Sequence, residues 1–246
     1  TTGSYVLCFV FVFWFFSSNK SELKINFSDL ILSNYIVKEI SSLGSITLAR
    51  QATVSVTYLL MNNILYNYGG EVSVTAYAIV GRLMMFALFP VYGITQGFLP
   101  IAGYNFGANN YERVKDVIYI AIKYASFFAT IVFLILMIFP ENITKIFTTD
   151  VNVIRETPPA MRWVFLATPI IAIQLIGAAY FQAIGKAKIG LLLALLRQGI
   201  LFVPLILILP LFFGEIGVWI SFPISDLLAT AITALILLRE IKKRLV

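Results

Sequence analysis

The sequence is a succession of apolar segments of about 20 residues, separated by short polar links. A helix of that length rises about 30 Å, which matches the thickness of a bilayer's hydrocarbon core. Hydrophobic residues make up 60% of the 246 residues and charged residues only 12%, whereas soluble domains carry about 25% charged residues. A soluble fold would leave too much apolar surface in water. The chain is therefore predicted to be an integral membrane protein.

The apolar segments predict an all-α membrane protein, a six-helix transmembrane bundle preceded by part of another helix. Runs such as Leu191–Leu196 are apolar at every position, which excludes the alternating strands of a membrane barrel. Most links are short, so neighbouring helices are expected to be antiparallel and to form a compact bundle. The predicted spans are Ser42–Asn67, Ser73–Tyr104, Val114–Phe139, Pro158–Ile184, Ile189–Phe213 and Ile216–Leu238.

The chain is expected to be a fragment that begins inside a membrane helix. The first apolar run, Thr1–Phe16, has no initiating methionine and no basic segment before it. Its helix would cover about 24 Å, less than the hydrocarbon core. Within the polar stretch that follows, Phe27–Ile40 predicts an interfacial amphipathic helix. The expected regions are a truncated helix (1–16), a cytoplasmic linker (17–40), a six-helix lobe (41–239) and a basic cytoplasmic tail (240–246).

The distribution of Lys and Arg predicts the orientation in the membrane. Eleven of them fall on the side of the linker and two in the opposite loops. Cytoplasmic loops carry the excess of positive charge, so the linker and the C-terminus are predicted to be cytoplasmic in a multi-pass cell membrane protein. The net charge of +6 then reflects topology, and no nucleic-acid partner is expected. The first group is Lys20, Lys24, Lys38, Arg113, Lys115, Lys186, Lys188, Arg239, Lys242, Lys243 and Arg244, and the second is Lys145 and Arg155.

Enzymatic chemistry is not expected. The chain has no histidine, so the Ser-His-Asp triad and histidine acid–base chemistry are excluded. Its one cysteine, Cys8, lies in an apolar run and has no partner for a disulfide or a metal site. No cofactor is predicted. The lipid bilayer is the one partner that composition demands.

Ionisable residues at membrane depth are costly and are the first candidates for function. Arg50, Arg82, Arg197 and Asp226 lie within predicted spans, whereas Lys123 lies near a helix end, where it can reach the interface. Arg197 and Asp226 lie roughly 13 Å and 19 Å from the same membrane face, on helices joined by a very short turn. An ion pair between them is plausible. It would either hold the two helices in register, or leave Asp226 to bind or relay a cation.

Polar amides and prolines also fall within the spans. Gln174 and Gln182 share a helical face, and Gln51 and Asn62 share another. Such stripes line either an aqueous cavity or a seam between helices. Prolines inside spans remove backbone hydrogen bonds, and transporters use such breaks at substrate sites. These prolines are Pro90, Pro100, Pro169, Pro204, Pro210 and Pro223.

Three stretches carry a family resemblance. The first is QGFLPIAGYNFGA at residues 96–108, the second is FQAIGKA at 181–187, and the third runs from Arg197-Gln198 through Pro204 to Asp226. They resemble the eighth, tenth, eleventh and twelfth helices of the multidrug and toxic compound extrusion (MATE) family of secondary transporters. The resemblance implies two six-helix lobes around a central cavity. This chain would be the C-terminal lobe, and the missing N-terminal lobe would be its partner.

Members of this family export small organic cations and other toxic compounds in exchange for Na⁺ or H⁺. Some members carry acidic residues in the seventh and tenth helices, but Gly44–Tyr66 and Ala160–Ile184 contain no Asp or Glu. This chain therefore resembles the branch whose coupling carboxylate lies in the first lobe, and no coupling acid is assigned here. The cavity and ion-pathway candidates are Arg50, Gln51, Asn62, Arg82, Gln96, Gln174, Gln182, Arg197 and Asp226.

The leading functional hypothesis is secondary active multidrug efflux by alternating access. One alternative is a flippase for lipid-linked oligosaccharides, which would need a larger and more cationic groove than Arg50, Arg82 and Arg197 supply. Another is a non-transporting membrane scaffold, whose spans would be purely apolar with small-residue seams.

Overall fold

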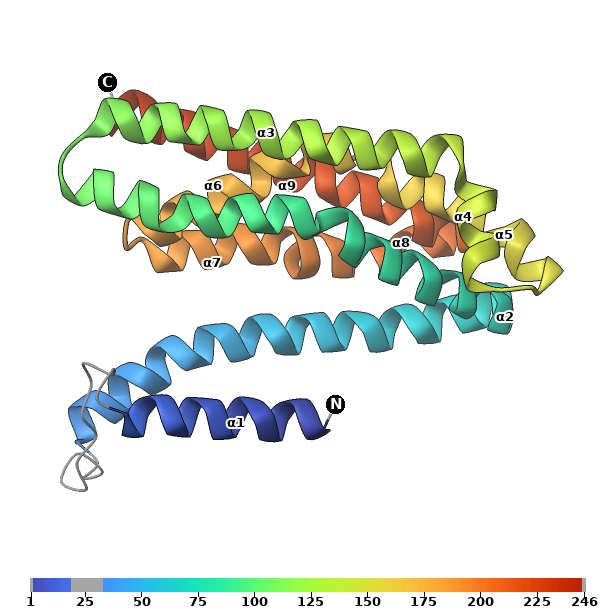
Figure 1. Ribbon diagram of the computed structural model, residues 1–246. Helices are drawn as coiled ribbons and strands as arrows, with labels where there is room; N and C mark the ends of the chain where they lie inside the picture. Colours follow the sequence, from blue (N-terminus) through green and yellow to red (C-terminus); the bar gives the residue numbers. More distant parts are fainter. Residues whose placement is uncertain (1, 19–32, 245–246) are drawn as a thin grey trace. The chain divides into compact units, whose positions relative to one another are not determined.

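The computed structural model describes residues 2–18 and 33–244 (Figure 1). The chain divides into two compact units, Thr1–Leu48 and Ala49–Val246. The first unit contains α1 (Thr2–Ser17) and the beginning of α2 (Asn34–Gly107), which continues into the second. Most of the predicted interfacial helix Phe27–Ile40 lies outside the described residues, and residues 34–40 belong to α2. Helix α2 therefore continues without a break from residues 34–40 into the first predicted span, where the sequence had predicted two separate helices.

Helix α2 folds back on itself at Gly70. Its apolar part, Gln51–Gly107, has 57 residues and would be about 85 Å long as one straight helix, nearly three times the hydrocarbon thickness. Gly70 has φ 67° and ψ −158°, a backbone conformation that favours glycine. Figure 1 shows the two limbs of α2 meeting at this bend and running in opposite directions. The bend lies in the predicted link Tyr68–Val72 and separates the first two predicted spans.

Within residues 2–18 and 33–244, five helical segments are long and apolar enough to cross a membrane, and the first of them is the folded Gln51–Gly107. With its two limbs counted separately, the six predicted crossings are present. The described residues of the bundle contain no strand, and short non-helical links such as residues 148–150 join its helices. Its other elements are α3 (Tyr111–Ile138), α4 (Pro140–Phe147), α5 (Val151–Phe165), η2 (Thr168–Ile170), α6 (Ile171–Ala183), α7 (Ala187–Leu195), η3 (Leu196–Ile200), α8 (Phe202–Phe213) and α9 (Glu215–Arg244).

The longest predicted link, Pro140–Thr157, is mostly helical. Pro140 occupies the first turn of α4, where its missing N–H is tolerated. An ion pair of 2.7 Å joins Lys145 to Glu141 one turn away, and this hydrogen bond holds the pKa of Glu141 below its usual value. Asp150 caps α5 by accepting a hydrogen bond from the backbone N–H of Asn152 at 2.8 Å. Local capping thus makes helices where low hydropathy had suggested a loop.

Two large buried clusters and a small one around Ala125 and Ala129 form the interior of the second unit. One joins both limbs of α2 to α5, α8 and the beginning of α9, and includes Met61, Tyr77 and Trp219. The other joins the end of α2 to α3, α6, α7 and the end of α9, and includes Phe98 and Tyr180. On α3 the buried positions include Ala121, Ala125 and Ala129, small residues that let helices approach closely in a membrane. The two clusters occupy different levels of the bundle.

The contact between α8 and α9 generates a prediction at Gly217. A Cβ atom there would lie 2.5 Å from the carbonyl oxygen of Leu209 and 2.8 Å from the nitrogen of Pro210. Both are backbone atoms, so Gly217→Ala should lower stability by about 1–3 kcal/mol. The measurement is the thermal midpoint in detergent, followed by fluorescence-detected gel filtration. The matched control is Gly93→Ala, whose added Cβ would meet no atom within 4 Å. Equal midpoints for the two variants would contradict this packing.

Candidate binding pocket in the helix bundle

A buried ion pair joins Arg197 of η3 to Asp226 of α9. The Arg197 Nε donates a hydrogen bond to the Asp226 Oδ1 at 2.6 Å. Only 8% and 6% of the two side chains are exposed. The pair lies between the two apolar clusters, because Phe222 on α9 belongs to one and Ala229 to the other. The predicted pair is thus present, at a middle level of the bundle.

The π-helical turn η3 places further polar groups around this pair. Its Leu201 N–H bonds to the carbonyl of Leu196 at 3.0 Å, five residues back instead of four. This shift leaves the Arg197 carbonyl free of its helical partner, and it accepts a hydrogen bond from the Ser225 hydroxyl at 2.8 Å. The Gln198 carbonyl accepts one from the Thr57 hydroxyl at 3.1 Å. The turn η3 therefore accepts hydrogen bonds from both α9 and the first limb of α2.

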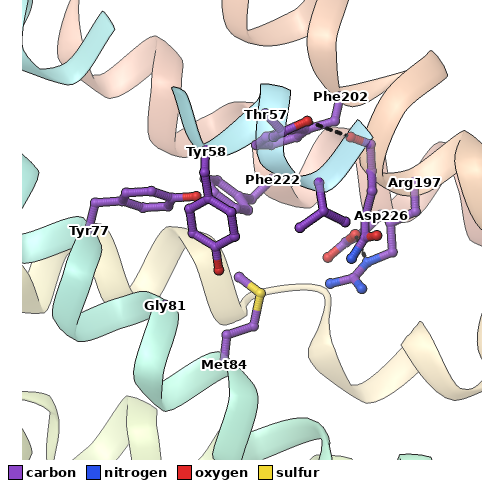
Figure 2. A pocket seen from close by; sticks show the side chains of 11 residues that line it. Thr57, Tyr58, Tyr77, Gly81, Met84, Arg197, Phe202, Phe222 and Asp226 are labelled. Atoms are coloured by element: carbon purple, nitrogen blue, oxygen red, sulfur yellow. Dashed lines mark hydrogen bonds and ion pairs between the residues drawn. The ribbon is translucent and has the colours of Figure 1, made fainter. Parts of the chain in front are cut away.

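A pocket opens beside the ion pair. It encloses about 550 Å³ of space between atoms, including its open mouth. Figure 2 shows Arg197 and Asp226 at one end, Tyr77 at the other, and Met84 along one side. Contributions come from both limbs of α2, from η3 and α8, and from α9. The lining residues are Val54, Thr57, Tyr58, Tyr77, Gly81, Met84, Arg197, Gln198, Phe202, Phe222 and Asp226.

Four of the nine other lining residues are aromatic. The ring centroids of Tyr58 and Tyr77 are 5.7 Å apart, those of Tyr77 and Phe222 6.5 Å, and those of Phe222 and Phe202 4.6 Å. These ring contacts thus extend from the far end of the pocket toward the ion pair. An apolar, aromatic site with a few convergent polar groups is the usual form of a small-molecule site. The geometry suits a flat ligand with a charged or polar group at one end.

The structure brings together only two of the predicted candidates at this pocket, Arg197 and Asp226. The side chain of Arg50 lies outside the described part of the chain. The other exposed candidates do not line this pocket, and their role in a cavity stays a prediction. They are Gln51, Asn62, Arg82, Gln96 and Gln182.

Gln174 has a different environment from Gln182, with which it was expected to share a face. Gln174 is buried in α6, and its Nε2 donates a hydrogen bond to the Leu193 carbonyl at 2.9 Å. Its Oε1 has no hydrogen-bond partner among the described residues. Gln182 is exposed one residue before the end of α6. Gln174 therefore joins α6 to α7, as expected of a helix seam.

Sequence reasoning missed the aromatic wall and two polar clusters. The Glu215 Oε1 accepts hydrogen bonds from the Ser73 hydroxyl at 2.6 Å and from the Trp219 Nε1 at 3.1 Å. Lys186 pairs with Glu240 at 2.6 Å. The first cluster joins the bend of α2 to α9, and the second joins the turn after α6 to α9. Glu215 and Glu240 lie at predicted span ends, where acidic residues are ordinary, so composition alone did not distinguish them.

Comparison with known proteins places this architecture in a family. The model of the family described as MatE matches residues 47–208. The Multidrug export protein MepA of Staphylococcus aureus (strain MSSA476) is 24% identical over 245 residues, which is 100% of this chain and 53% of the relative. The solved structure of the MATE multidrug transporter DinF-BH is 36% identical, with a TM-score of 0.79, and covers 96% of this chain and 52% of that one.

Two further solved structures share the fold. An outward-facing multidrug resistance MATE family transporter of the MOP superfamily has a TM-score of 0.83 at 22% identity and covers 96% of this chain and 54% of that one. An inward-facing structure with the same description has a TM-score of 0.83 at 23% identity and covers 94% and 54%. The chain thus spans about half the length of the proteins it matches.

The fold and the pocket define a multi-pass helical membrane protein with a polar centre, the class to which membrane transporters belong. With the family model matching residues 47–208, the chain belongs to the MATE family.

The ion pair generates a stability prediction. Replacing one partner leaves the other charge buried and unpaired, so Arg197→Met or Asp226→Leu alone should cost about 3–5 kcal/mol. The double variant Arg197→Met/Asp226→Leu removes both charges and should regain most of that loss. The measurement is the unfolding midpoint of each purified variant in the same detergent. Losses that simply add in the double variant would show that the two side chains do not stabilise each other.

Proposed function

We propose that this chain is the C-terminal lobe of a secondary active transporter that exports small organic compounds in exchange for H⁺ or Na⁺. A second lobe, corresponding to the other half of its relatives, would complete the transporter. The observation that carries the proposal is the aromatic pocket with its buried ion pair, inside a bundle of the MATE family. The similarity to MepA, a multidrug export protein, and to DinF-BH, a multidrug transporter, supports the same substrate range.

Alternating access would require this lobe to move as one body. The chain fits the outward-facing and the inward-facing structures equally well, with a TM-score of 0.83 to each. At 22% and 23% identity, these likenesses show that the fold of the lobe is shared. Rocking of whole lobes about a shared centre is how transporters built of repeats expose a site to each side in turn. The ties from η3 to α2 and α9 would keep the pocket intact during that movement.

The coupling group is proposed to lie outside this chain. Asp226 is engaged by Arg197 at 2.6 Å, so its charge is balanced within the lobe. The described residues contain no cluster of three or more Asp, Glu, His or Cys that would hold a metal ion. These observations support coupling through a carboxylate of the other lobe, as does the absence of acids in Gly44–Tyr66 and Ala160–Ile184.

The alternative functions are less well supported by the pocket. A flippase for oligosaccharide lipids would need a cationic groove, but Arg197, the one arginine among the described side chains that line this pocket, is neutralised by Asp226. A scaffold would have no reason to keep a buried ion pair beside open space, because an apolar pair of similar volume is often as stable. Drug export explains both the aromatic wall and the charges.

Orientation is tested with reporter fusions. The excess of Lys and Arg predicts a cytoplasmic C-terminus, so green fluorescent protein joined after Val246 should fluoresce. Alkaline phosphatase inserted after Thr149, between α4 and α5, should be active because that link is predicted to face outward. As controls, the two reporters are exchanged between these positions, where both should be inactive. An active phosphatase at the C-terminus would reverse the proposed topology.

Export is tested in cells that express the complete two-lobe transporter containing this chain. Ethidium should leave these cells faster than cells with the empty vector. When the proton and sodium gradients are collapsed separately, loss of the gradient that drives export should abolish the difference. Tyr77→Leu in the pocket should lower the initial rate severalfold, whereas Tyr119→Leu, on the exposed surface of α3, should not. Ethidium retention equal to the empty vector would contradict drug export. Equal rates for the two tyrosine variants would place the substrate elsewhere.

A further inference from the structure

The ion pair beside the pocket uses only part of the bonding capacity of its two side chains. A guanidinium has five N–H donors and a carboxylate two acceptor oxygens. Among the protein groups that the structure describes, the pair is bonded only through the Arg197 Nε and the Asp226 Oδ1. The Nη groups of Arg197 and the Oδ2 of Asp226 therefore retain bonding capacity. Both side chains line the pocket, and more than nine-tenths of each is buried.

The remaining groups have opposite charge and lie close together. Because the Nε and Oδ1 are 2.6 Å apart, the free donors and the free acceptor are only a few ångströms from one another by the covalent size of the two groups. A ligand that used both would need an anionic and a cationic group with equally short spacing. Tyr58, Tyr77 and Phe222 would then pack against its apolar body.

We propose that this pocket binds small aromatic zwitterions whose ammonium and carboxylate are attached to one carbon, as in an aromatic amino acid. Arg197 would take the carboxylate and Asp226 the ammonium. The assignment rests on the proposed export function and names a substrate class for this lobe.

The charge balance of the pocket favours a zwitterion over a singly charged ligand. The pair has no net charge, so a ligand cation attracted by Asp226 is repelled by Arg197. A ligand anion is attracted by Arg197 and repelled by Asp226. A zwitterion places each charge against its opposite, and both contacts are charge-assisted hydrogen bonds to side chains that are more than nine-tenths buried. Losing one such contact lowers binding by at least about tenfold, the equivalent of a hydrogen bond to a charged group.

The test uses three indole compounds that differ in a single group. Tryptophan carries both charges, tryptamine lacks the carboxylate, and indole-3-propionate lacks the ammonium. Binding of each to the purified chain in lipid nanodiscs is measured by equilibrium dialysis at pH 7, with empty nanodiscs subtracted. Tryptophan should bind at least about tenfold more tightly than either analogue.

Variants locate the site and the origin of the preference. In Arg197→Gln/Asp226→Asn, which keeps a neutral hydrogen-bonding pair, the three ligands should bind within about threefold of one another. Gly81→Leu places a side chain in the pocket and should weaken all three. Gly93→Leu on the same limb of α2, where an added Cβ meets nothing within 4 Å, should weaken none.

Three outcomes would overturn the assignment. They are saturable binding with no preference for tryptophan, a preference that survives in Arg197→Gln/Asp226→Asn, and the absence of binding above empty nanodiscs. If the double variant is recovered only as aggregate, the Gly81→Leu and Gly93→Leu comparison still decides whether the pocket is the site. Because these are binding measurements, their failure is distinguishable from a failure of ethidium export.

Discussion

The hydrocarbon core of a membrane offers no hydrogen-bond partners, so every backbone group in a membrane-crossing segment needs a partner within the protein. The π-helical turn η3 is where this bundle departs most clearly from regular α-helix. There the Arg197 and Gln198 carbonyls are bonded by Ser225 of α9 and Thr57 of α2. The departure from regular helix is thus compensated by side chains of two other segments. These bonds also bring the three segments that surround the ion pair to one place.

Polar interactions occur at three levels of the bundle, and α9 takes part in each. Glu215 at its beginning holds the bend of α2 through Ser73, Asp226 pairs with Arg197 at its middle, and Glu240 near its end pairs with Lys186. Apolar clusters fill the levels between. Helix α9 is thus anchored to other segments at three depths of the bundle. The middle level is the one beside which the pocket opens.

Some features of the fold were readable from local sequence because their causes are local. Apolar length marked the crossings, and Gly70 lies in the link predicted between the first two. The region Pro140–Thr157 was predicted as a link because its hydropathy is low, yet α4 and the beginning of α5 are helical through a proline first turn, an Asp150 cap and the Glu141–Lys145 pair. These short-range signals are weaker than hydropathy, so hydropathy masked them.

The sequence by itself determined that this chain crosses a membrane as helices, how many times it crosses, and that Arg197 and Asp226 lie at similar depth. Hydrophobicity and the helical rise are properties of each segment alone, which is why those conclusions needed no packing. Only the tertiary structure decided that Tyr58, Tyr77 and Phe222 line the same pocket as the ion pair, and that Gln174 is buried while Gln182 is exposed. Those facts depend on how each helix is rotated toward its neighbours, and in an evenly apolar segment no local signal records that rotation.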